Sequence, residues 1–306
     1  MTAAPTRSGV LVVDKPAGVT SFDVVGCVRR RLGMRRVGHA GTLDPDATGV
    51  LPMLLGEATK LMPYLAEDDK EYRAVVRFGV RTDTQDLSGR VLTETAPPPL
   101  TRETVAAAAR AFVGRIRQTP PMYSALHHEG RRLYELAREG IEVPRAPREV
   151  VVHAIDVEDV SGAAATLRVV CGKGTYVRAL AADLGDTLGV GAAVERLCRL
   201  RVGSFALADA VSWPELSEGT PATLRTRIAP PEAALAGWPA IRLDGARAEA
   251  FRHGQTIESP GVGAGHARVH DADGALIGVG IVDARGGVRP VRILHADRPD
   301  ARVLPA

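Results

Sequence analysis

The stretch GHAGTLDPDATGVL, Gly38–Leu51, combines ionisable residues with residues that interrupt regular structure. It holds one histidine, two aspartates and three glycines, and a proline follows the first aspartate. Glycine and proline at this density favour an irregular loop over a helix or a strand. We therefore predict a loop over 38–51, with Asp44 near its centre.

Two roles fit Asp44. In one, the Asp-Pro pair begins a helix: the aspartate caps the helix, and the proline is its first residue. A catalytic aspartate instead needs a partner that keeps it ionised, and Arg178 in GKGTYVRAL is a candidate for a two-point contact. Glycosidases place two acids on either side of the bond that they cleave. Asp46 is too close in sequence to be expected opposite Asp44.

Composition limits the class of protein. The 306 residues are 45% hydrophobic with a mean hydropathy of −0.01, which is typical of a soluble globular chain of one or two domains. A net charge of +3 permits a nucleic-acid partner without requiring one. No apolar run reaches the roughly 20 residues of a membrane-spanning helix, and the N-terminal residues do not resemble a signal peptide. We expect a cytoplasmic protein with no membrane partner.

The sequence indicates neither a metal nor a cofactor. Cys27, Cys171 and Cys198 are far apart, so we expect reduced, packed thiols without a disulfide or a zinc site. The glycine run GVGAGH at 261–266 lacks the spacing of a dinucleotide-binding loop and is interpreted as an ordinary loop.

Hydrophobic patterning predicts strands and helices that alternate irregularly, which favours an α+β fold with a mixed or antiparallel sheet over a doubly wound fold. Strands are expected at 9–14, 72–80, 149–159 and 165–171. Helices are expected from a cap at Thr20 or Ser21 to Gly33, over 101–113, within 118–140, and within 171–189 after a glycine-rich turn.

The C-terminal part of the sequence suggests a second, smaller unit. Proline, glycine and alanine are enriched over 217–240, as at many domain boundaries. Beyond that segment, DADG at 271–274 predicts a hairpin among several short strands. We expect one domain over 1–235 and a β-rich module over 240–300.

Five motifs, in order, resemble those of bacterial tRNA pseudouridine synthases of the TruB family. They are GVLVVDKPAGVTS (9–21), GHAGTLDPDATGVLPMLLGEATKL (38–61), EYRAVVRFGVRTDTQDLSG (71–89), PPMYSALHHEGRRLYELAREGIEVPR (120–145) and CGKGTYVRALAADLGDTLGVGAAVERLCRLRVGSF (171–205). Other pseudouridine synthase families carry Arg-Leu-Asp where this chain has Thr42-Leu43-Asp44. The resemblance covers about the first 215 residues.

The resemblance implies catalytic roles for three residues. Asp44 matches the catalytic aspartate of the family, and Arg178 matches the arginine that pairs with it. Tyr72 matches the tyrosine that stacks on the flipped uracil and takes part in proton transfer.

Four further residues match positions that contact the substrate or support its site. His39 matches the histidine that helps extrude the target nucleotide and fills its place. Tyr176 and Leu197 match residues that line the uridine pocket. Lys15, in the DKP motif, is expected to have a supporting role.

The resemblance also implies a reaction and a partner. The substrate would be uridine 55 in the T-loop of tRNA, whose N1–C1′ bond is cleaved before the uracil rotates and rejoins through C5. This isomerisation requires no cofactor or metal. The aspartate could attack C1′ or C6, or take a proton from C2′. Monomeric behaviour is expected, as are a mobile insertion at about 118–148 and a PUA-like RNA-binding domain at the C-terminus.

Two other classes of protein share part of this pattern. A tRNA-folding factor would open and reanneal the elbow of tRNA, with catalysis secondary. A nucleoside hydrolase-like enzyme would release free uracil, but no second acid stands out. The arginines within 29–36 are also open to two interpretations, either as cations at a helix C-terminus or as contacts to RNA phosphates.

Overall fold

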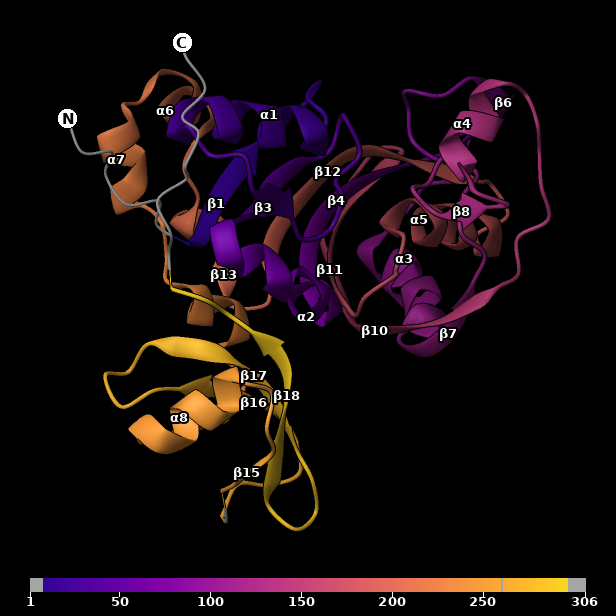
Figure 1. The fold of residues 1–306 in the computed structure, drawn as a ribbon. Coiled ribbons are helices and arrows are strands. Elements are labelled where there is room, and N and C mark those ends of the chain that lie inside the picture. The colour runs from indigo at the N-terminus through magenta and orange to yellow at the C-terminus, as the bar shows by residue number, and fades with distance from the viewer. Residues whose placement is uncertain (1–7, 260, 297–306) are drawn as a thin grey trace.

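Two β-sheets organise the chain in the computed structural model, which describes residues 8–259 and 261–296 (Figure 1). The larger sheet runs in the order β1 (Gly9–Lys15), β3 (Thr48–Leu55), β12 (Ala192–Val202), β4 (Lys70–Phe78), β11 (Ala164–Cys171), β10 (Arg148–Ser161) and β7 (Gly114–Gln118). Strand β2 (Val37–His39) pairs with β3, and β13 (Phe205–Ala206) pairs with β12. Strands β3 and β12 are parallel and the other pairs are antiparallel, so the predicted mixed sheet is confirmed.

Helices and two hairpins complete the described chain. The α-helices are α1 (Ser21–Leu32), α2 (Met62–Glu67), α3 (Arg102–Ala109), α4 (Leu133–Arg138), α5 (Val177–Thr187), α6 (Trp213–Glu218), α7 (Pro221–Thr226) and α8 (Gly245–Arg252). Short 3-10 helices cover Gly56–Leu61, Arg110–Phe112, Leu207–Asp209 and Pro231–Leu235. The hairpins join β5 (Val80–Thr82) to β6 (Val91–Glu94) and β8 (His127–His128) to β9 (Arg131–Arg132).

Helix α1 shows how local sequence sets an element. The Thr20 hydroxyl accepts the amide N–H of Asp23 at 3.1 Å, and the Asp23 carboxylate accepts the amide N–H of Thr20 at 3.0 Å. Such a cap contributes about 1 kcal/mol. Gly33 ends the helix with a φ of 65°, a conformation that glycine adopts without strain. Both predicted ends of this helix are confirmed.

The prediction of a loop over 38–51 is wrong at both ends. Strand β2 includes Gly38 and His39, and β3 begins at Thr48, so the irregular part is only 40–47. The apolar run after Ala47 pairs along its length with β1, and this pairing outweighs the proline at 52. Asp44 caps no helix: its carbonyl accepts the amide N–H of Ala47 at 3.1 Å and closes a turn with Pro45 at the second position.

The remaining predicted elements lie close to the observed ones. Strands β4, β10 and β11 match within two residues at each end. Helix α3 ends at Ala109 and continues as a 3-10 turn, earlier than the predicted end near Val113. The segment 217–240, predicted as a domain boundary, includes α7 and a 3-10 helix, and both α6 and α7 contact α1.

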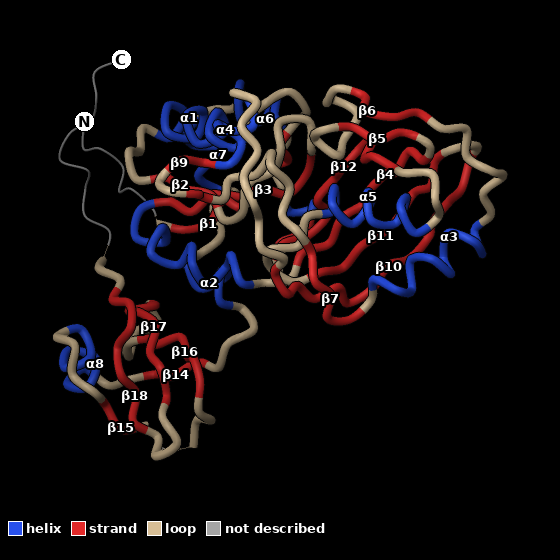
Figure 2. The backbone as a smooth tube through the Cα atoms, turned by 90° about the vertical axis from the view of Figure 1, so that its right-hand side faces the viewer, coloured by secondary structure: helices blue, strands red, loops and turns tan. Residues whose placement is uncertain are grey.

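The smaller sheet forms a C-terminal module that Figure 2 shows set off from the larger body. Its strands run in the order β14 (Ala240–Arg242), β16 (Gly265–His270), β17 (Leu276–Val282), β18 (Gly287–Ile293) and β15 (Ile257–Glu258). The predicted DADG hairpin joins β16 to β17 and is closed by a hydrogen bond from Gly274 N–H to the Asp271 carbonyl at 3.1 Å.

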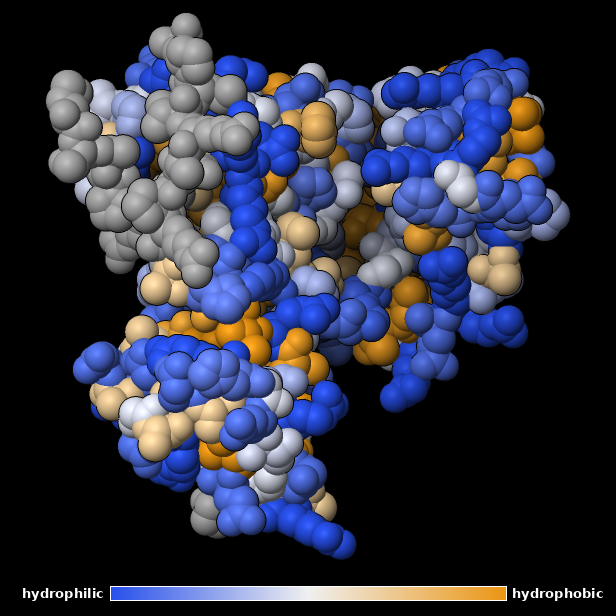
Figure 3. All heavy atoms as spheres, in the orientation of Figure 1, coloured by the Kyte–Doolittle hydropathy of each residue, from blue (hydrophilic) through white to orange (hydrophobic). Residues whose placement is uncertain are grey.

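The module packs on the larger body through an apolar cluster. Val279 and Leu294 lie in one buried cluster with Leu61, and Figure 3 shows hydrophobic surface gathered at this junction. Lys60 Nζ also donates to the Ile293 carbonyl at 2.7 Å.

Within the described ranges, each helix is either too short or too polar to cross a bilayer. Cys27 and Cys171 are buried thiols and Cys198 is a half-buried one, so the three side chains are packed as predicted.

Candidate active site

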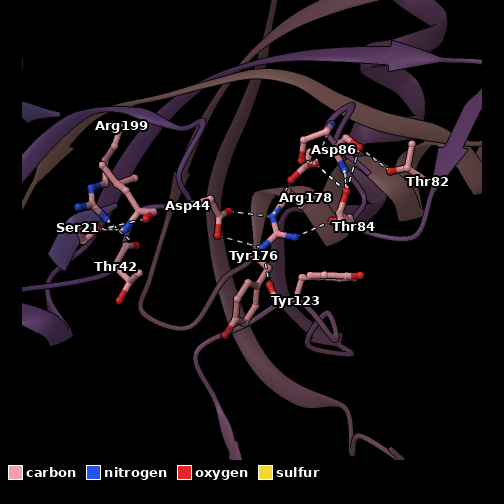
Figure 4. Close-up of polar contacts among 12 residues, drawn as sticks. Ser21, Thr42, Asp44, Thr82, Thr84, Asp86, Tyr123, Tyr176, Arg178 and Arg199 are labelled. Carbon is pink, nitrogen blue, oxygen red and sulfur yellow. Dashed lines mark hydrogen bonds and ion pairs between the residues drawn. The ribbon is translucent and has the colours of Figure 1, made fainter. Parts of the chain in front are cut away.

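Asp44 and Arg178 form a two-point ion pair, shown in Figure 4. Arg178 Nε donates to Asp44 Oδ2 at 2.8 Å, and Arg178 Nη2 donates to Oδ1 at 3.1 Å. The Arg178 side chain is only 5% exposed, whereas that of Asp44 is 40% exposed. A buried guanidinium therefore holds a carboxylate that stays open to a ligand, and this is the partner that the sequence suggested for Asp44.

Arg178 is itself fixed from two other segments. Its Nη1 donates to the Thr84 carbonyl at 2.6 Å, and its Nη2 donates to the Tyr123 carbonyl at 2.7 Å. The Asp86 carboxylate lies 3.7 Å from Nε and adds a second negative charge. Arg178 stands in the first turn of α5, so this helix sets the position of the guanidinium that holds the Asp44 carboxylate.

The loop that carries Asp44 is anchored on the side of α1. The Ser21 hydroxyl donates to the Leu43 carbonyl at 3.1 Å and accepts the Leu43 amide N–H at 3.0 Å. Gly18 N–H donates to the Pro45 carbonyl at 3.0 Å. The backbone on both sides of Asp44 is therefore fixed.

Lys15 supports the same loop from beneath. Its side chain is fully buried, and Nζ donates to the carbonyls of Pro16, Val19 and Pro45 at 2.6–2.8 Å. All three donors are used in the protein, so the support that Lys15 gives is structural and does not involve contact with a substrate. Burial lowers the pKa of Lys15 to about 8, although the carboxylates of Asp46 and Asp44 oppose this shift.

This lowered pKa predicts a pH dependence of stability. Between pH 8 and 10.5 the unfolded chain, with the ordinary lysine pKa of 10.5, binds more protons at Lys15 than the folded protein does. The contribution of Lys15 to the free energy of unfolding therefore rises with pH, by up to about 1.4 kcal/mol per pH unit. Lys15→Met is expected to lose this rise in urea titrations across that range. Lys60→Met is the matched lysine control, and equal slopes for Lys15→Met and the wild type would contradict the prediction.

Tyr72 and Leu197 line the sheet face behind this loop. Tyr72 lies on β4 opposite Arg199 of β12, and Leu197 lies opposite Ala74. Both side chains are half-buried and contact both of the large apolar clusters of the body. Burial raises the pKa of the Tyr72 phenol, and the nearby Arg199 guanidinium opposes this rise.

Tyr176 immediately precedes α5 and is tied to the start of the segment 118–148. Its amide N–H donates to Gln118 Oε1 at 2.8 Å, and Gln118 Nε2 donates to its carbonyl at 3.0 Å. Burial raises the pKa of the Tyr176 phenol, against the Ser124 hydroxyl, which lowers it. The phenol of this half-buried side chain therefore keeps its proton near neutral pH.

His39 ends β2, at the start of the loop. Burial lowers the pKa of its imidazole, and the positive charge of Arg199 lowers it further, so the ring is neutral at pH 7. Within the described residues, its buried Nδ1 has no hydrogen-bond partner, while a hydrogen bond with the Gly41 backbone opposes the lowering of the imidazole pKa.

Sequence reasoning missed three residues that the structure brings to this site: Ser21, Asp86 and Arg199. Asp86 lies in the TDTQD part of a quoted motif, and its charge shortly after the predicted strand over 72–80 is a usable signal. Arg199 is a charged residue within strand β12, and its burial depends on tertiary contacts that no local pattern shows.

The arginines within 29–36 do not all face solvent freely. Arg29 Nη2 donates to the Val37 carbonyl at 3.1 Å, Arg31 donates to the Gly219 carbonyl, and Arg36 pairs with Glu57. Arg30 and Arg35 are exposed.

In residues 8–259 and 261–296, no three His, Cys, Asp or Glu side chains gather as metal ligands would.

Comparison with known proteins shows the family of this chain. A model of the N-terminal domain of TruB family pseudouridylate synthases matches residues 29–177, and models of TruB C-terminal domains match 178–236 and 239–294. A tRNA pseudouridine synthase B from Dechloromonas aromatica (strain RCB) is 48% identical over 287 residues, covering 94% of this chain and 95% of the relative. The chain belongs to the TruB family of pseudouridine synthases. The predictions of an enzyme and of this family are confirmed.

Other TruB relatives and solved structures extend the comparison. A tRNA pseudouridine synthase B from Moorella thermoacetica is 49% identical over 249 residues, covering 80% of this chain and 81% of the relative. A chain from an H/ACA RNP bound to a substrate RNA containing 2′-deoxyuridine superposes with a TM-score of 0.71 at 23% identity, covering 94% of this chain and 85% of its own. A chain from a Cbf5-Nop10-Gar1 complex gives 0.72 at 24% identity, with 95% and 85% covered. These two likenesses concern the fold.

Proposed function

We propose that this TruB protein converts uridine 55 in the T-loop of tRNA to pseudouridine. The observation that carries the proposal is the half-exposed carboxylate of Asp44, fixed at two points by the buried guanidinium of Arg178. The names of the relatives, tRNA pseudouridine synthase B, support tRNA as the substrate.

In this proposal Asp44 reacts in its ionised form. The carboxylate attacks C1′ or C6, or takes a proton from C2′, while N1 leaves C1′ and the uracil rotates to rejoin through C5. Every heavy atom of the uracil is retained: C5 loses its proton to solvent when it bonds to C1′, and N1 takes up a proton. Arg178 keeps the carboxylate charged and correctly oriented throughout.

The pocket residues act on an extruded nucleotide. Removing a base from its stack costs a few kcal/mol, and aromatic stacking returns roughly 1–3 kcal/mol per base. Tyr72 supplies the stacking surface, and Tyr176 and Leu197 line the pocket around it. His39, neutral and at the edge of the loop, fills the position that the nucleotide leaves.

Two further parts of the chain contribute binding surface in this proposal. The segment 118–148, which carries its own small apolar cluster of Met122, Leu133 and Leu136, closes over the T-loop. The module over 240–300 acts as a PUA-like domain on the outer part of the tRNA.

Release of tritium from tRNA labelled at C5 of uridine tests the proposal. An unmodified transcript should lose label equivalent to one uridine per molecule, and mapping of the product should place pseudouridine at position 55. A transcript with cytidine at position 55 is the control and should lose no label. Tight tRNA binding without release would instead favour the tRNA-folding factor.

A further inference from the structure

Arg199 is the largest fully buried side chain of the described residues, and it lies directly behind the Asp44 loop. Its Nε donates to the Val50 carbonyl at 2.8 Å, and Nη2 donates to the Gly41 carbonyl at 3.0 Å. Its Nη1 reaches the Thr42 carbonyl at 3.5 Å. One guanidinium therefore holds the backbone on both sides of Asp44.

A second feature makes Arg199 unusual: its hydrogen bonds go to backbone carbonyls and to the Tyr72 side chain, and not to an acid. Among the described residues, no carboxylate lies within 4.0 Å of it. Arg201, two residues along the same strand, instead pairs with Glu71 and is 34% exposed. Burial of an arginine without a counter-ion is costly, so a simple strand-pairing role would be served better by an apolar residue.

The close packing around Arg199 leaves the loop little freedom. Gly49 has a φ of 102°, and a Cβ placed there would lie 2.2 Å from the Arg199 carbonyl oxygen. Side chains that are directly opposite on paired strands share a face, so Arg199 also stands beside Tyr72. The guanidinium thus joins the loop of Asp44 to the strand that carries the stacking tyrosine.

We infer that Arg199 is a positioning residue for the reaction: it sets the span between Gly41 and Val50, on either side of Asp44, and so places the Asp44 carboxylate against C1′ and C6 of the flipped uridine. The inference rests on the proposed function. Arg199 does not touch the substrate in this role, and its effect is exerted through the carbonyls of Gly41, Thr42 and Val50. Misplacing a reacting group by about 1 Å lowers the rate by about 10²-fold.

The variant Arg199→Lys distinguishes the effect of guanidinium geometry from the effect of positive charge. Arg199→Lys keeps the positive charge, but a single nitrogen cannot reach carbonyls on both sides of the loop. We expect its single-turnover rate of tritium release, at saturating enzyme, to fall by about 10²-fold. The Kd for tRNA should stay at the wild-type value. Arg201→Lys, in the same strand, is the matched control and should keep the wild-type rate.

A rescue experiment adds a readout that a purely structural role would not move. Arg199→Ala leaves a space of the right shape, so added guanidinium should restore part of its rate, while the same concentration of sodium chloride should not. Thermal melts and a repeat assay at low temperature measure the folded fraction of each variant.

Three outcomes would overturn the inference. The first is a wild-type single-turnover rate in Arg199→Lys. The second is a rate loss that disappears when the rate is corrected for the folded fraction of the variant. The third is failure of Arg199→Lys to fold, which would show that Arg199 is a purely structural residue. Failure of the proposed function itself is distinguishable, because wild-type protein would then release no tritium from uridine 55.

Discussion

Replacing Asp44 by asparagine is expected to abolish tritium release from tRNA while leaving tRNA binding intact. Asparagine keeps the shape of the side chain but can act neither as a nucleophile nor as a base, so the rate should fall by at least about 10⁴-fold. The side chain is 40% exposed, and so its change should have little effect on the fold. The measurement is single-turnover release with the wild type and Asp44→Asn, beside the Kd for tRNA by filter binding.

Asp46→Asn provides the matched control for Asp44→Asn. Asp46 lies two residues along the same loop and is exposed, and its change removes one negative charge as well. We expect near wild-type release from Asp46→Asn. Equal losses in the two variants would show that the charge of the loop matters and not the carboxylate of Asp44. Turnover by Asp44→Asn would remove Asp44 from the chemistry.

Replacing Arg178 by lysine should have the next largest effect. A lysine ammonium cannot make the two parallel contacts to Asp44 and also reach the carbonyls of Thr84 and Tyr123. The carboxylate would keep a nearby positive charge but lose its orientation, and we expect a loss of about 10²- to 10³-fold in the single-turnover rate. The Kd for tRNA should rise less than the rate falls.

Arg73→Lys controls for the loss of a two-point arginine pair elsewhere. Arg73 contacts both carboxylate oxygens of Glu158, at 2.7 and 3.2 Å, and is 52% exposed. Exposed pairs of this kind contribute about 1 kcal/mol or less, so turnover should be unchanged. A wild-type rate in Arg178→Lys would show that charge alone is enough at position 178.

Much of the architecture follows from local sequence. The cap at Thr20 and the glycine at 33 mark helix ends that local hydrogen bonds and a local backbone conformation fix. The pairing of Asp44 with Arg178 was also predictable, since an ionised catalytic carboxylate needs a cation and the motif at 171–205 offered one. Tyr72, Tyr176 and Leu197 came from the resemblance and not from any periodicity.

The errors arose where distant strands decide the outcome. The predicted loop over 38–51 is shorter in the structure because β3 pairs with β1 and β2 pairs with β3. These pairings satisfy backbone groups that counts of glycine and proline ignore. Arg199 and Lys15 are charged residues in the core, and their partners are carbonyls up to 158 positions away in sequence. No window of sequence shows such contacts.

Arg178 Nη2 donates both to Asp44 Oδ1 and to the Tyr123 carbonyl. Tyr123 belongs to the segment 118–148, in which Gln118 also holds the backbone of Tyr176. Any displacement of that segment must therefore disturb the donor that aligns the carboxylate. One nitrogen of Arg178 therefore couples the position of this segment to the alignment of the Asp44 carboxylate.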